Sequence, residues 1–125
     1  MKATHTYLHF DGNCRDAMTF YAKCLGTQLD LVPFSEGAPD RILHASVGSD
    51  PLTIMAADIK PGEPFRQGNN FSISLACESL EEMERLFAAF GKGGTVTEAI
   101  HDSFWGAKFG MLTDRFGVSW MFSFR

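Results

Sequence analysis

Residues 6–26 read TYLHFDGNCRDAMTFYAKCLG, and the spacing of their apolar side chains changes once along this run. The first five residues alternate in character, which predicts a β-strand. The turn Asp11-Gly12-Asn13 ends this alternation, and Asn13 is a residue type that commonly caps the start of a helix. The apolar residues that follow fall on one helical face, and Gly26 stands where helices often end in a left-handed residue. The run therefore predicts one strand followed by one helix.

Three further strands are predicted after this helix, at Gln28–Pro33, Arg41–Val47 and Leu52–Ala57. In the last two, apolar and small side chains recur at every second position, as they do in strands. Residues 58–69 contain two prolines and two glycines and show no periodicity. We expect this segment to link two modules.

The same order of elements then begins again. Residues 71–76 alternate like residues 6–10, and Ser79–Glu82 reads as a capping box at the start of a second helix, which we expect to end at Gly91. Three more strands are predicted, at Thr95–Ala99, Ala107–Thr113 and Ser119–Phe124.

The two halves of the chain match in the spacing of their elements. Equivalent positions, such as Leu8 and Leu75, are separated by about 66 residues, which is typical of a duplicated module. The predicted fold class is α+β, with two tandem βαβββ modules in a single domain of 125 residues. Module 1 spans about residues 1–58, the linker about 58–69 and module 2 about 70–125.

One face of each sheet must be buried under the helix of its module. The residues expected on this face are the more apolar set of each strand: Thr6, Leu8, Phe10, Leu43, Ala45, Val47, Phe71, Ile73, Leu75, Trp120, Phe122 and Phe124.

The opposite face mixes polar, aromatic and thioether side chains, which is typical of the lining of a small-molecule site. The residues expected to bind a ligand are Tyr7, His9, Met55, Ser72, Trp105 and Met121. Trp105 precedes a strand, and its ring either stacks on a planar ligand or packs at a loop or dimer contact. His5 and His44 are the candidate catalytic residues, because the ordinary pKa of histidine, about 6.5, suits a general acid or base.

Composition excludes several classes of partner. The net charge is −4 and no cluster of Lys or Arg occurs, so no nucleic-acid partner is expected. The longest apolar runs fall short of the roughly 18 residues of a membrane span, and the N-terminus does not resemble a signal peptide. The three cysteines form no C-x-x-C pair. We therefore expect free thiols and a cytoplasmic location.

Three segments carry a resemblance to a known family: YLHFDGNCR at residues 7–15, SISLACE at residues 72–78, and FWGAKFGMLTDRFGVSWM at residues 104–121. Through them the chain resembles the vicinal oxygen chelate superfamily, which includes glyoxalase I, extradiol dioxygenases and the fosfomycin- and bleomycin-resistance proteins. It is most similar to the PhnB-like branch. The resemblance implies curled sheets that each form half of a cup, and a homodimer.

The resemblance also implies a metal site with one ligand from the first and last strand of each module. Those positions fall on His5, Met55, Ser72 and Met121. Only His5 is a suitable ligand for zinc, nickel or iron, because a thioether is a soft ligand and a serine hydroxyl is a poor neutral one. We therefore predict no metal cofactor, with His5 the one candidate ligand should a divalent metal bind.

Two main functions remain open. The first is a metal-free protein that binds a small molecule in the cup. The second is an enzyme of the lyase or isomerase type that uses His5 or His44 as acid and base or as partial metal ligands. An interaction role with a filled cup is a third alternative. Metal-dependent glyoxalase and dioxygenase activities are disfavoured, as is methyl transfer, because Asp11-Gly12-Asn13 is a helix-capping turn and no Gly-rich cofactor loop occurs.

Overall fold

The computed structural model describes residues 1–34, 37–38 and 40–125. The chain divides into two compact units, Met1–Arg66 and Gln67–Arg125. The boundary falls inside the segment that was expected to link the two modules. None of the helices in the described ranges is long and apolar enough to cross a membrane.

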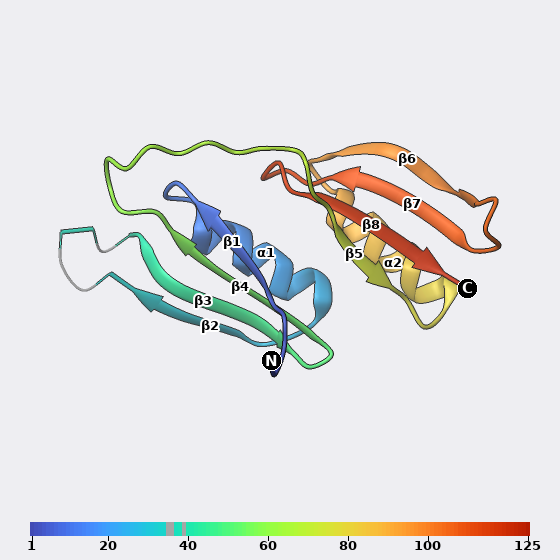
Figure 1. Ribbon diagram of the computed structural model, residues 1–125, viewed down its shortest axis with the longest axis horizontal. Coiled ribbons are helices and arrows are strands. Elements are labelled where there is room, and N and C mark those ends of the chain that lie inside the picture. Colours follow the sequence, from blue (N-terminus) through green and yellow to red (C-terminus); the bar gives the residue numbers. More distant parts are fainter. Residues whose placement is uncertain (35–36, 39) are drawn as a thin grey trace. The chain divides into compact units, whose positions relative to one another are not determined.

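Unit 1 contains one helix and a four-stranded sheet (Figure 1). Its elements follow in the order β1 (Thr6–Phe10), α1 (Cys14–Leu25), β2 (Leu29–Pro33), β3 (Ile42–Ser49) and β4 (Leu52–Asp58). The strand order in the sheet is β1-β4-β3-β2, with β1 parallel to β4 and the other pairs antiparallel. The first and last strands of the unit therefore lie side by side.

Unit 2 repeats this arrangement. Its elements are β5 (Ile73–Ala76), α2 (Leu80–Gly91), β6 (Thr95–Asp102), β7 (Lys108–Thr113) and β8 (Ser119–Phe124). The strand order is β5-β8-β7-β6, again with the first and last strands parallel. The predicted α+β fold with two tandem βαβββ modules is confirmed.

Helix α1 ends at Gly26 as predicted, because this glycine adopts the left-handed conformation with φ of 67°. Its start differs from the prediction. The side chain of Asn13 makes no capping hydrogen bond. The Asp58 carboxylate, at the end of β4, accepts the backbone N–H groups of Gly12 at 2.7 Å and Cys14 at 3.1 Å instead. A buried carboxylate from another strand thus replaces the local cap.

Helix α2 begins with the predicted cap. The Ser79 hydroxyl accepts the N–H of Glu82 at 3.0 Å, and the Glu82 carboxylate accepts the N–H of Glu78 at 2.9 Å. The helix includes Gly91, where it was expected to end, and the left-handed glycine is Gly93, with φ of 79°. Both caps satisfy N–H groups that would otherwise have no partner in the helix.

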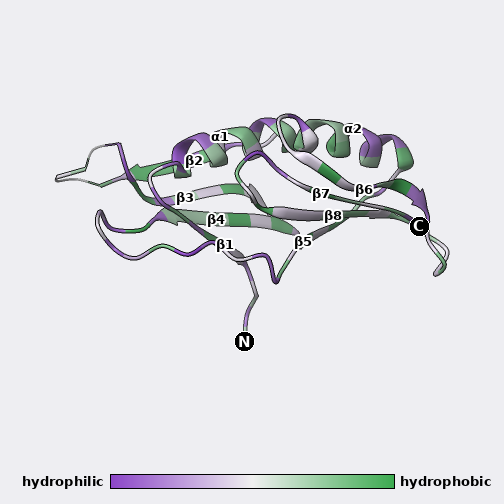
Figure 2. Cartoon of the chain, turned by 90° about the horizontal axis from the view of Figure 1, so that it is seen from above, coloured by the Kyte–Doolittle hydropathy of each residue, from purple (hydrophilic) through white to green (hydrophobic). Residues whose placement is uncertain are grey.

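Each unit packs its helix on one face of its own sheet (Figure 2). The largest fully buried side chains of unit 1 on this face are Met18, Tyr21, Ile42, Val47 and Ile54, and those of unit 2 are Met83, Phe90, Leu112, Trp120 and Phe122. In unit 2 the Phe90 ring lies 4.5 Å from Trp120 and 5.6 Å from Phe122, measured between centroids. Three aromatic side chains therefore pack together in the core of that unit.

Two of the residues predicted to face a helix do not. Leu43 is 55% exposed, because an irregularity in the β2–β3 pairing shifts the register between Val32 and Pro33 and buries Ile42 in its place. A bulge of this kind reverses the face on which side chains emerge. Phe71 is 54% exposed, because it precedes the start of β5 and lies beyond the paired part of the sheet.

Candidate functional site

The candidate site lies on the face of the unit 1 sheet opposite α1, where no helix of that unit packs. We call it the uncovered face of unit 1. Its side chains alternate with the buried ones along β1, β3 and β4, as the pleat of a sheet requires. The residues that form its centre are Tyr7, His9, His44, Ser46, Met55 and Ala57.

Strand pairing brings these residues together from distant parts of the chain. Met55 pairs with Tyr7 on β1 and with Ser46 on β3. Ala57 pairs with His9 in the same way. Four of the predicted site residues, Tyr7, His9, His44 and Met55, therefore lie on one face of one unit.

A hydrogen bond joins Tyr7 to His44 across this face. The Tyr7 hydroxyl lies 3.0 Å from Nδ1 of His44, and their ring centroids are 5.7 Å apart. The His9 ring packs against the Tyr7 ring, with 5.3 Å between the two ring centroids. The pair is open to ligands, because Tyr7 remains 41% exposed.

Ala57 lies on β4, between the two strands that carry these rings. Its side chain points to the uncovered face, since Ala56 next to it is fully buried on the helix side. Ala57 is nevertheless only 9% exposed. β4 lies between β1 and β3, and Tyr7 and His44 are hydrogen-bonded across it. A small residue here leaves room for that contact.

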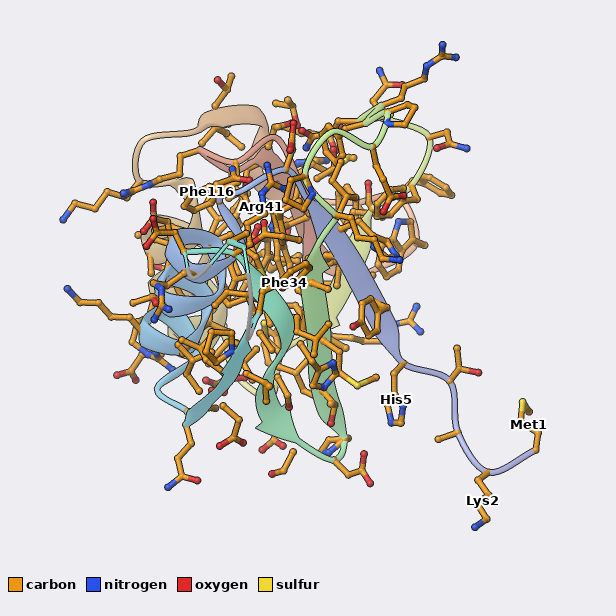
Figure 3. The ribbon with its side chains drawn as sticks, turned by 90° about the vertical axis from the view of Figure 1, so that its left-hand side faces the viewer. Met1, Lys2, His5, Phe34, Arg41 and Phe116 are labelled. Carbon is orange, nitrogen blue, oxygen red and sulfur yellow. The ribbon has the colours of Figure 1, made fainter. Side chains whose placement is uncertain are left out.

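His5 is not part of this group. It precedes β1 and is exposed. Figure 3 places it at the foot of β1, where the chain continues into the N-terminal tail that carries Lys2 and Met1. Among the two predicted acid–base candidates, only His44 has a hydrogen-bonded partner among the described side chains.

The remaining predicted site residues belong to unit 2. Met121 lies on the face opposite α2 and pairs with Ser74 and Met111. Ser72 precedes β5 and is half-buried. Met121 therefore lies on a face of the unit 2 sheet, whereas Tyr7, His9 and Met55 lie on a face of the unit 1 sheet.

Trp105 lies in the loop between β6 and β7. Its ring packs 6.0 Å from Phe109, and the Arg125 guanidinium lies 5.8 Å from the Trp105 centroid. The Arg125 side chain also donates a hydrogen bond to the Trp105 carbonyl. The ring is thus held by its own unit and remains 41% exposed.

Comparison with known proteins assigns the chain to a protein family. Residues 2–123 match the protein family described as 3-demethylubiquinone-9 3-methyltransferase. The chain belongs to this family. Protein YjdN of Escherichia coli K12 is 33% identical to it over 134 residues, which covers 92% of this chain and 90% of YjdN.

Solved structures of similar proteins share the fold. The protein PA1353 from Pseudomonas aeruginosa is 38% identical and superposes with a TM-score of 0.86 over 98% of both chains. A Bacillus cereus PhnB protein described as a putative 3-demethylubiquinone-9 3-methyltransferase is 24% identical, with a TM-score of 0.84 over 99% of this chain and 100% of that one.

The wider fold group is the glyoxalase/bleomycin resistance/dioxygenase superfamily. A glyoxalase/bleomycin resistance protein from Albidiferax ferrireducens has a TM-score of 0.71 at 19% identity, over 100% of this chain and 99% of that chain. The chain therefore shares the fold of this superfamily, as the sequence resemblance predicted.

The metal site implied by the resemblance to this superfamily does not fit the side chains of this protein. The four equivalent positions carry one imidazole, two thioethers and one hydroxyl, on His5, Met55, Ser72 and Met121. Only the first is a common ligand for a hard or borderline divalent metal. In the described parts of the chain, no group of three or more His, Cys, Asp and Glu side chains is arranged to hold a metal ion. We derive no chemistry through a metal.

The turn before α1 is also unsuited to binding a phosphate group. Helix starts bind anions through free N–H groups. Here the Asp58 carboxylate accepts the N–H groups of Gly12 and Cys14, and its second oxygen accepts the N–H of Ile42 at 2.8 Å. Sequence reasoning missed Asp58 and placed it in the linker. The sequence feature that could have indicated its role is an acidic residue directly after the apolar run of β4. Because β4 is parallel to β1, the end of β4 lies beside the turn that follows β1.

None of the three thiols has the character of a nucleophile. Burial raises the pKa of the Cys14 thiol to about 12, and the nearby Asp58 carboxylate adds to the effect. Burial also raises the pKa of Cys77, with a further increase from Glu82 and a decrease from Arg85. Cys24 is buried in the core. A reactive thiol needs a lowered pKa and access to solvent.

Proposed function

We propose that this protein binds a small molecule on the uncovered face of unit 1 without the metal that many relatives of its fold use. The observation that carries the proposal is the hydrogen bond between Tyr7 and His44, placed among apolar and aromatic side chains. Ligand sites commonly combine a partly apolar lining with a few fixed polar groups. An exposed hydrogen bond adds little to stability, so this pair is better explained by recognition of a ligand.

Binding is tested by a thermal-shift screen of metabolites and antibiotics, because a ligand of the native state raises its melting temperature. The shift produced by a hit is expected to disappear in Tyr7→Phe, which removes only the hydroxyl. The control is His101→Gln, which removes an exposed imidazole from β6 of unit 2. A screen without any hit, or a hit that Tyr7→Phe binds unchanged, would contradict the proposal.

A second candidate is an enzyme of the lyase or isomerase type with His44 as its acid and base. It is favoured by the same hydrogen bond, because a second group that holds the ring fixes its tautomer and orientation. Turnover of a bound compound that is lost in His44→Gln, with binding retained, would support this candidate over simple binding.

The family description names a methyltransferase. A nucleotide-type methyl donor is usually held by a Gly-rich turn with free N–H groups. The corresponding N–H groups of Gly12 and Cys14 are engaged by Asp58. We therefore do not include methyl transfer in the proposed function.

We further propose a homodimer in the cytoplasm. The support is the fold group and the free state of Cys14, Cys24 and Cys77. Light scattering at micromolar concentration tests the dimer, and a monomeric mass would contradict it. Alkylation of the thiols in intact cells, followed by mass spectrometry, tests the location.

A further inference from the structure

The hydrogen bond between Tyr7 and His44 can be made in two ways, which present different groups to a ligand. In the first, the Tyr7 hydroxyl donates to Nδ1 of His44, and only lone pairs of the phenolic oxygen face outward. In the second, Nδ1–H of His44 donates to the Tyr7 oxygen, and the hydroxyl hydrogen of Tyr7 points away from His44. The observed distance of 3.0 Å between the two atoms allows both.

The second arrangement forms a chain of two donors in series. Each donor in such a chain strengthens the next, so the outer hydroxyl becomes a better donor than an isolated one. When His44 is protonated, both its nitrogens are donors and the second arrangement is the one that remains. A ligand oxygen that carries negative charge therefore favours protonated His44, and protonated His44 favours such an oxygen.

The charged groups around the pair are few. On β1 the neighbouring titratable side chain is His9, and on β4 the facing residues Met55 and Ala57 are neutral. On β2, Asp30 pairs with Ser46, one strand away from the pair and on the side of His44. The uncovered face carries no Lys or Arg among the described residues of these strands.

A face whose described strand residues include no guanidinium or ammonium group favours some anions over others. A carboxylate is usually recognised by a cation, often a forked arginine with two parallel hydrogen bonds. The Tyr7 hydroxyl offers one hydrogen bond to one oxygen. Phenols and enols expose a single acidic oxygen, and an ordinary phenol has a pKa of about 10, like tyrosine itself.

The surroundings favour a planar body for the ligand. The Tyr7 and His9 rings lie 5.3 Å apart at an interplanar angle of 36°, and Tyr7 is 41% exposed. Met55, the strand partner of Tyr7, adds a polarizable thioether to the same surface. Thioethers and aromatic rings both pack well against a planar aromatic molecule.

We propose that the uncovered face of unit 1 binds a planar compound with an acidic hydroxyl, a phenol or an enol, as its anion. This inference rests on the proposed small-molecule function and names its ligand class. The hydroxyl proton of the ligand passes to the Tyr7 oxygen while the Tyr7 proton passes to Nδ1 of His44. One ligand O–H bond is broken, one N–H bond is formed, and the total charge is unchanged. The ligand anion is then held by Tyr7, which is backed by the His44 imidazolium.

The test uses para-nitrophenol, whose anion is yellow and whose neutral form is not. Wild-type protein is titrated into the phenol at a pH below the pKa of the free compound. We expect the yellow absorption to increase with protein concentration and to saturate. Both Tyr7→Phe and His44→Gln should abolish the increase and weaken binding about tenfold or more, as for the loss of a hydrogen bond to a charged group. His101→Gln should behave as wild type.

Two further probes separate this inference from the proposed function. Neutral para-nitroanisole lacks the acidic proton, and para-nitrobenzoate carries a carboxylate; both should bind more weakly than the phenol. Equal binding of the phenol and the anisole without colour would overturn the anion proposal and leave small-molecule binding intact, as would preference for the benzoate. If para-nitrophenol does not bind but a compound of another chemical class raises the melting temperature, the proposal of phenols and enols as ligands is wrong and small-molecule binding stands. If nothing binds, both proposals fail.

Discussion

Asp58 fixes the start of β3 through Ile42, whose backbone N–H donates to Oδ2 of the carboxylate at 2.8 Å. The other oxygen, Oδ1, accepts the N–H groups of Gly12 and Cys14 in the turn before α1. Asp58 is only 5% exposed. One buried carboxylate thus connects the end of β4 with two segments that are far from it in sequence.

Substitution of Asp58 should therefore destabilise the protein strongly. Asp58→Ala leaves three backbone donors without their acceptor, and we expect a loss of about 2–4 kcal/mol in the free energy of unfolding. Asp58→Asn keeps one oxygen but turns an N–H₂ group toward a donor, so its loss should be of similar size. Urea denaturation measures both. Asp16→Asn, an exposed acidic residue in the first turn of α1, is the control and should cost less than about 1 kcal/mol.

Gly94 should tolerate no side chain. A Cβ at this position would contact the Thr113 carbonyl oxygen and lie 2.9 Å from Cα of Asp114, both backbone atoms that cannot move aside. We expect Gly94→Ala to lower the free energy of unfolding by about 1–3 kcal/mol. Gly68→Ala is the matched control, because its Cβ would meet only the flexible Asn70 side chain at 3.5 Å. Equal melting temperatures for the two variants would refute this packing argument.

The buried thiol of Cys14 should make the protein less stable at alkaline pH. Its pKa rises from an ordinary value of 9.0 to about 12 in the folded chain. Below pH 9 the thiol is protonated in both states and has no effect; above it, only the unfolded state loses the proton. Stability should then fall by up to about 1.4 kcal/mol per pH unit from this group.

The measurement for Cys14 is urea denaturation between pH 8 and pH 11 in wild type and in Cys14→Ala. The variant has lower stability at pH 8 because it leaves a small cavity, but its stability should decline less steeply with pH. Cys77→Ala serves as the control for a half-buried thiol. Parallel curves for wild type and Cys14→Ala would count against the assignment.

Ala57 should determine whether the Tyr7–His44 pair can form. Ala57→Val adds bulk on β4, opposite His9 and between the strands that carry Tyr7 and His44, so we expect loss of the hydrogen bond and of ligand binding with little change in stability, because valine is well suited to a strand. NMR of the His44 ring reports the hydrogen bond directly. Ala76→Val, an exposed position on β5 of unit 2, is the control and should preserve both signals. A retained His44 signal in Ala57→Val would argue against this role.

The fold was largely predictable because it depends on local patterns that are repeated. Alternation located the strands, Gly26 and Ser79 located helix ends, and the repeat gave the βαβββ order. Leu43 was placed on the wrong face because a bulge depends on how β2 pairs with β3, which periodicity alone does not reveal. Asp58 was missed because its partners lie on other elements.

The sequence predicted which residues share the face of the candidate site, but it did not predict which of their side chains contact one another. Alternation identified Tyr7, His9, His44 and Met55 as one lining. It did not indicate that Tyr7 would reach His44 across β4, because that contact requires the parallel register of β1 and the small Ala57 between them. His5 looked equivalent to the others in the pattern, but the strand begins one residue after it.

The single carboxylate of Asp58 also has a consequence for amide hydrogen exchange. The amides of Gly12, Cys14 and Ile42 share one acceptor group, so a movement of Asp58 out of its site frees all three at once. We expect these three amides to exchange at one common, slow rate, as a cooperative group that opens only when the β4 terminus leaves the sheet.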